Sequence, residues 1–143
     1  MAASMIRSLF TILVIGLLAT GCSTLDVHKA KNADLKQYKK AYVLHLLTDG
    51  HGVDELVAAE LRARGLQVAA GPMTMMPDDT EILVEYRDEW AWDFKNYLIG
   101  LDIQIKKVRT DEVIGAGHLY RPTMVLGAPP SRMVADVIAP LFK

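Results

Sequence analysis

Cysteine is almost missing from this sequence, because Cys22 is the single one among 143 residues. A disulfide within the chain needs two cysteines, and a CxxC metal or redox site needs two as well, so both are excluded. A zinc site would depend on histidine and carboxylate ligands, and the chain has only 4 histidines. Disulfide scaffolds and cysteine-based metal domains are thereby ruled out as classes.

An excess of one sign of charge is missing too. The chain has 16 Lys and Arg against 17 Asp and Glu, a formal net charge of −1. This balance provides no long-range field of the kind that attracts nucleic acid, so we expect no nucleic-acid partner. The sequence also contains no GxSxG, HExxH, P-loop or dinucleotide-binding signature. We therefore expect neither an enzyme nor a bound cofactor.

The most apolar run lies near the N-terminus and is short. Residues 9–18 follow a start that carries one positive charge, Arg7, and they precede the small residues 19–21. A run of about ten residues cannot span a bilayer, which needs about twenty. Charge, apolar run and small residues in this order are typical of a secretory signal. The sequence therefore predicts a signal peptide over residues 1–21.

Cys22 follows this signal directly. The string LATGC over residues 18–22 resembles the signal of bacterial lipoproteins, in which the cysteine is acylated and becomes the first residue of the mature protein. The resemblance implies a covalent lipid on Cys22 and a membrane as the first partner. By the same resemblance, Ser23 implies sorting to the outer membrane, facing the periplasm. The alternative is an ordinary secreted protein with an unpaired cysteine.

The first part of the mature chain is expected to differ from the rest. Residues 22–40 are polar without a sustained apolar period, which predicts a flexible tether. Residues 41–143 are expected to form a single α/β domain. An apolar run predicts a strand over 41–47, and an apolar stripe at 3.6-residue spacing predicts a helix over 53–64. A short strand over 66–70 would complete a βαβ unit with parallel strands.

The remaining chain predicts a meander and a last helix. Residues 82–94 alternate between an aromatic-rich face and a charged face, and strands over 97–105 and 113–120 follow it. In 97–105 the odd positions are expected to share the apolar face. The stripe in 131–142 predicts a helix that kinks or stops near Pro140. The expected fold class is α/β (α+β), in the order β-α-β-β-β-β-α: one mixed twisted sheet with an antiparallel meander and two helices packed on one face.

This pattern resembles the small bacterial lipoproteins that join such a signal to a compact α/β domain. The resemblance depends on YRDEWAWDFKNYLIGLDIQI over residues 86–105 and on MVADVIAPLF over residues 133–142. It implies a membrane-anchored, non-enzymatic binding or accessory subunit of an envelope complex, with an envelope protein as partner.

Tyr86, Trp90 and Trp92 form the candidate partner surface. They occupy even-numbered positions of the predicted strand, as the apolar Ile82 and Val84 do. Burial under a helix is therefore the alternative interpretation. Asp88 is a carboxylate on this same face of the strand, and we expect it to pair with an arginine or to cap a bulge.

A first candidate for ligand or metal binding is the turn that holds His45, Asp49 and His51. It joins a strand to a helix, where α/β proteins often bind ligands. The alternatives are a hydrogen-bonded core histidine at His45 and a plain turn residue at His51.

A second candidate is the thioether cluster of Met73, Met75 and Met76, since thioethers favour soft Cu(I). Apolar loop packing is the alternative. Together the two candidates define the alternative function, a periplasm-facing ligand or metal carrier.

Overall fold

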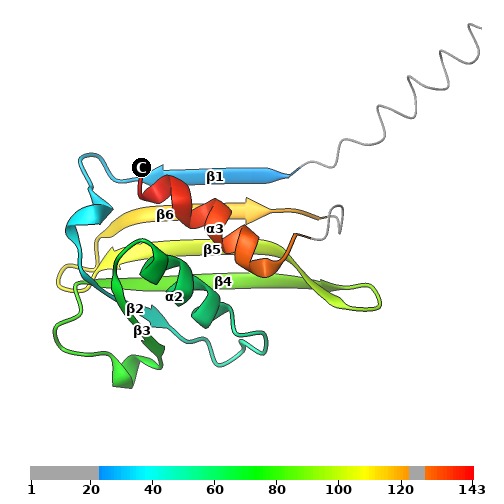
Figure 1. Ribbon diagram of the computed structural model, residues 1–143, viewed down its shortest axis with the longest axis horizontal. Helices are drawn as coiled ribbons and strands as arrows, with labels where there is room; N and C mark the ends of the chain where they lie inside the picture. Colours follow the sequence, from blue (N-terminus) through cyan, green and yellow to red (C-terminus); the bar gives the residue numbers. More distant parts are fainter. Residues whose placement is uncertain (1–22, 123–127) are drawn as a thin grey trace, which may run out of the picture.

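Six strands form one sheet, and two helices cover one of its faces in the computed structural model, which describes residues 23–122 and 128–143 (Figure 1). The predicted signal peptide and Cys22 lie outside the described residues. The strand order is β1-β6-β5-β4-β2-β3. The elements are β1 Thr24–Lys29, η1 Leu35–Gln37, β2 Lys40–Leu44, α2 Val53–Ala63, β3 Gln67–Gly71, η2 Met73–Met75, β4 Ile82–Trp92, β5 Asn96–Lys107, β6 Val113–Tyr120 and α3 Pro130–Leu141.

The predicted fold class is confirmed. Strand β2 runs parallel to β3 and to β4, as expected for a βαβ unit. Strands β4, β5, β6 and β1 are antiparallel neighbours, so the sheet is mixed and contains the meander. Helix α3 continues through Pro140 and ends one residue later. Among the described residues, no helix is both long and apolar enough to cross a bilayer.

The prediction of a flexible tether over residues 22–40 is wrong for most of that stretch. Strand β1 pairs with β6 along its whole length, from Thr24 opposite Tyr120 to Lys29 opposite Gly115. The side chain of Leu35 is buried in the core. A strand at the edge of a sheet gains much of its order from backbone hydrogen bonds to one neighbour, so it needs few apolar side chains; in β1 it is Val27 that packs against the core. The apolar pattern is therefore too weak to reveal β1.

The core lies between the sheet and the two helices. Val43, Val84 and Ile103 line the sheet side, while Val57 and Val137 come from the helices. Alternation along the strands sends these residues to one face and the polar residues to the other. The main core is thus on the helix side of the sheet. On the second face Tyr42 and Leu83 are buried at the β2–β4 pair, and the strands from β5 to β1 carry exposed polar side chains.

A β-bulge changes the expected face of β5 near the hairpin. Glu89 pairs with Gly100, but the next residue, Trp90, pairs with Leu98, so Ile99 is an extra residue. The bulge reverses the alternation, and Leu98 takes the buried position. The expectation that the odd positions share the apolar face is therefore wrong from Ile99 towards the N-terminus of the strand.

Candidate functional site

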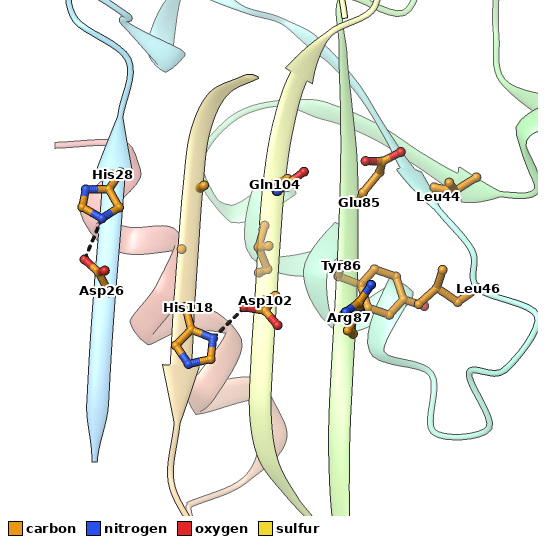
Figure 2. Close-up of a pocket in the computed structure, with 13 residues that line it drawn as sticks. Asp26, His28, Leu44, Leu46, Glu85, Tyr86, Arg87, Asp102, Gln104 and His118 are labelled. Atoms are coloured by element: carbon orange, nitrogen blue, oxygen red, sulfur yellow. Dashed lines mark hydrogen bonds and ion pairs between the residues drawn. The ribbon is translucent and has the colours of Figure 1, made fainter. Parts of the chain in front are cut away.

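The face of the sheet away from the helices carries rows of polar side chains (Figure 2). One row crosses four strands, because the register places Asp26 opposite His118, His118 opposite Asp102, and Asp102 opposite Arg87. Acidic and basic groups alternate along it, which is the favourable arrangement for cross-strand neighbours. We call this set the polar row.

Histidine–aspartate contacts join several of these side chains. His118 Nδ1 lies 2.6 Å from Asp102 Oδ1, and on β1 His28 Nε2 lies 3.0 Å from Asp26 Oδ1. The Asp102–His118 pair and the Asp26–His28 pair are the dashed contacts in Figure 2. The face therefore presents polar groups that already contact one another, which suits recognition of a polar surface.

A hollow of about 580 Å³ lies on this face. The second row across the sheet runs from His28 through Ala116 and Gln104 to Glu85. Ala116 has only a methyl group, and it lines the hollow between longer neighbours. Leu44 supplies an apolar wall on the β2 side (Figure 2). The hollow could hold a side chain or small ligand of mixed polarity.

The turn between β2 and α2 is organised by the Asp49 carboxylate. Oδ1 accepts hydrogen bonds from the backbone N–H groups of His51 and Gly52, each at 2.8 Å. Oδ2 accepts from the N–H groups of Val53 at 2.8 Å and Asp54 at 3.2 Å. These donors belong to the start of α2, whose first N–H groups have no partner within the helix. Asp49 therefore acts as a capping residue.

Tyr86 completes this arrangement, since its hydroxyl donates to Asp49 Oδ2 at 2.7 Å. Burial acts to raise the pKa of Asp49, but the hydrogen bonds from Tyr86 and the backbone outweigh it and hold this pKa below its usual value. Burial, and then the hydrogen bond to Asp49, raises the pKa of Tyr86 well above its usual value. Both groups keep their usual charge at neutral pH, so the pair is structural in character.

The two histidines of the turn have different partners. His45 Nδ1 lies 2.8 Å from Asp54 Oδ2, and one ligand atom each from His45, Asp49 and Asp54 all lie within 4.8 Å of one another. His51 belongs to a second such group, with Asp49 and Asp88, and its ring stacks on Trp90 with centroids 3.9 Å apart and an interplanar angle of 17°. The predicted cluster is thus brought together around Asp49, although that carboxylate already accepts five hydrogen bonds.

The predicted aromatic surface does not form one patch. Tyr86 is buried, Trp90 is half-buried under His51, and Trp92 is 72% exposed. Asp88 accepts a hydrogen bond from Trp90 Nε1 at 2.6 Å, so an indole takes the place of the expected arginine. The buried alternative is therefore correct for Tyr86 and wrong for Trp92.

The three methionines lie apart from the histidine turn, in the connection between β3 and β4. Met73 and Met75 belong to η2 and are both exposed, with Met75 at 71%. Met76 follows η2 and is half-buried. The cluster is a surface feature and not part of the apolar core.

The sequence predicts part of the polar row but not its alignment. Alternation in the strands places Arg87 and Asp102 on the polar face, together with Glu85 and Gln104. His118 and Asp102 are 16 residues apart and become neighbours only when β5 pairs with β6. Asp26 is missed because the sequence does not predict strand β1.

The comparisons with known proteins point to a fold. No family profile matches the sequence, and no curated protein is significantly similar to it. A solved structure of a single-substitution form of PelC from Paraburkholderia phytofirmans, described as a dodecamer, superposes with a TM-score of 0.62 at 18% identity, covering 82% of this chain and 98% of that one. Another PelC dodecamer from that organism gives a TM-score of 0.59 at 15% identity, covering 84% and 94%. Identity this low shows that the chain shares the PelC fold and shows nothing more.

Proposed function

We propose that this chain is a membrane-anchored lipoprotein of the bacterial envelope, a non-enzymatic binding or accessory subunit on the periplasmic side of the outer membrane. Three features of the sequence support the anchor. They are the signal over residues 1–21, the string LATGC that ends at Cys22, and Ser23 after it. Two or three acyl chains on Cys22 would hold the protein stably, since a single chain gives only marginal binding.

The observation that carries the binding role is the uncovered polar face of the sheet. Its hollow of about 580 Å³ and the polar row lie opposite the helices, where the fold leaves strand surface for a partner. Polar side chains on this face already contact one another, as His118 and Asp102 do, and a preformed polar surface suits complementary docking.

A second copy of this chain is the first partner to consider. The structural neighbour PelC is described as a dodecamer. Among the strands of residues 23–122 and 128–143, β1 pairs only with β6 and β3 only with β2, so each edge strand has one side without a strand partner there. An open edge can accept a further strand or a neighbouring subunit.

Lipidation is tested by mass spectrometry of the mature protein purified from membranes. The N-terminal peptide should begin at Cys22 and carry the mass of a diacylglyceryl group, with or without an amide-linked chain. A Cys22→Ser variant should lose this mass. A mature N-terminus at another residue, or an unmodified Cys22, would refute the anchor.

The binding face is tested by site-specific photo-crosslinking in intact cells. A photoreactive amino acid in place of Gln104, on the hollow, should give a defined adduct, while one in place of Thr110, in the exposed β5–β6 turn, should give none. An adduct of twice the chain mass identifies a second copy. Adducts from Thr110 alone would place the partner elsewhere.

The alternative function, a ligand or metal carrier, is favoured by one observation. His45, Asp49 and Asp54 offer ligand atoms within 4.8 Å of one another. Calorimetric titration of the purified protein with Zn²⁺ tests it: a carrier should bind one ion, and His45→Gln should abolish the heat. The same heat of Zn²⁺ binding in the variant and in the wild-type protein would contradict this alternative. The absence of any binding heat in both proteins would contradict it too.

A further inference from the structure

Two aromatic side chains project from the hairpin that joins β4 to β5. Trp92 is 72% exposed and Phe94 is 92% exposed. Their ring centroids are 6.1 Å apart at an interplanar angle of 41°, so they form one small apolar surface. We call residues 92–95 the hairpin tip. Large apolar side chains grouped at a protruding turn gain nothing from the core and indicate contact with something outside the chain.

The backbone of the tip disfavours the residue that occupies its apex. Phe94 has φ of 60°, in the left-handed region where Gly or Asn is the usual residue. A bulky side chain is strained in this conformation. With so little burial, folding provides no compensation for Phe94 within the chain. The aromatic ring is therefore better explained by an external contact than by local stability.

The register places this tip relative to the start of β1. Thr24 pairs with Tyr120, Tyr120 with Gly100, and Gly100 with Glu89, so these four residues lie at one level across the sheet. Strand β4 runs on for three more residues to Trp92. At about 3.4 Å per residue, the tip lies about 10 Å beyond the start of β1.

A lipid on Cys22 would be attached near the same end of the molecule. Figure 1 shows β1 beginning at the end of the sheet where β4 turns into β5. Cys22 precedes Thr24 by two residues, and two residues span at most about 7 Å. A lipid on Cys22 would therefore bring the bilayer surface to the level of the hairpin tip.

We propose that the hairpin tip inserts Trp92 and Phe94 into the boundary between headgroups and acyl chains of the bilayer that holds the Cys22 lipid. An indole is suited to this boundary, because its ring is apolar and its N–H can bond to headgroups. The exposed Lys95 beside it can meet phosphate. The proposal depends on the lipid anchor proposed above.

The second contact would give the protein a defined orientation. In the strand order, β4 lies three strands away from β1, a separation of about 14 Å at about 4.8 Å per strand. An anchor at a single point leaves a domain free to swing, whereas two points at this distance hold the sheet upright. The polar row would then have a fixed orientation relative to the membrane.

Depth-dependent fluorescence quenching tests the proposal with the lipidated full-length mature protein. The chain has 2 tryptophans, so Trp90→Phe leaves Trp92 as the reporter and Trp92→Phe leaves Trp90. In phosphatidylcholine vesicles brominated part-way along one acyl chain, Trp92 should be quenched at least twofold. Trp90, stacked on His51, should not be quenched and serves as the internal control.

Charge insertion provides a matched pair of variants in the Trp90→Phe background. Phe94→Asp should abolish most of the quenching of Trp92, because a carboxylate at the apex resists insertion. Met75→Asp, at an apolar residue of η2 that is 71% exposed, should leave the quenching unchanged. Equal loss in both variants would overturn the proposal.

Flotation of the same samples separates the two proposals. Protein that floats with vesicles while Trp92 stays unquenched would overturn the insertion and leave the anchor intact. Blue-shifted Trp92 emission that depends on protein concentration, without quenching, would assign the tip to a second copy and also overturn it. Protein that does not float, with no lipid on Cys22, would overturn both.

Discussion

At the scale of single residues, Asp49 links three parts of the fold. Its carboxylate accepts four N–H groups at the start of α2 and the hydroxyl of Tyr86 on β4, and it sits in the loop after β2. Gly52, the residue before α2, makes no side-chain cap, so Asp49 performs that task from three positions earlier. One side chain therefore fixes both the helix start and its position on the sheet.

We expect Asp49→Ala to lower the free energy of unfolding by about 3 kcal/mol, because it leaves several N–H donors without a partner. Urea denaturation measures the change. The exposed Asp78 provides the control, and Asp78→Ala should change stability by less than about 0.5 kcal/mol. Equal effects of the two substitutions would contradict the capping role.

The stabilisation by Asp49 should depend on pH in one direction. Its pKa is lower in the folded protein than its ordinary value of 3.8, so the contribution is fully present above about pH 4. It is lost as the pH falls through the folded-state pKa. The stability gap between the wild-type protein and Asp49→Asn should therefore narrow below about pH 4 in urea titrations. If this stability difference widened below about pH 4, the pKa of Asp49 would be raised by folding and not lowered.

At the scale of elements, Gly117 lets α3 approach the sheet. A Cβ at Gly117 would lie 2.5 Å from Val137 Cγ1, which is too close for any real contact. Gly117→Ala should therefore destabilise the protein by about 1–3 kcal/mol through overpacking. In the double variant Gly117→Ala/Val137→Ala, part of this loss should return, and the coupling should be about 1 kcal/mol or more. Additive effects in denaturation would contradict a direct clash.

Strand β1 lies where the sequence predicts a flexible tether. Since β1 pairs with β6, the amides of residues 24–29 that bond to β6 should be protected from hydrogen exchange in the folded protein. Val27→Pro should remove that protection and spare residues 96–107 of the distant β5. If the amides of residues 24–29 exchanged at the rate of an unfolded chain, the prediction of a flexible tether would be correct.

At the scale of the whole molecule, the sheet begins close in sequence to the proposed attachment point. Strand β1 starts at Thr24, two residues after Cys22. In vesicles to which lipidated protein is added from outside, a thiol introduced by Thr24→Cys should react slowly with a membrane-impermeant maleimide. Thr110→Cys, in the turn at the other end of β5, should react several-fold faster. Detergent should abolish the difference, and equal rates in vesicles would show a domain that swings freely.

The local patterns of the chain specified much of this protein. Alternation in 82–94 and the apolar stripes of α2 and α3 predict their elements correctly because each pattern depends on neighbours in sequence. The tertiary structure alone decided the strand status of residues 24–29, the exposure of Trp92 and the polar row. These depend on backbone pairing and register between distant strands, which side-chain periodicity does not encode. The β5 bulge also depends on strand pairing: one extra residue, Ile99, places Leu98 and not its odd-numbered neighbours in the core.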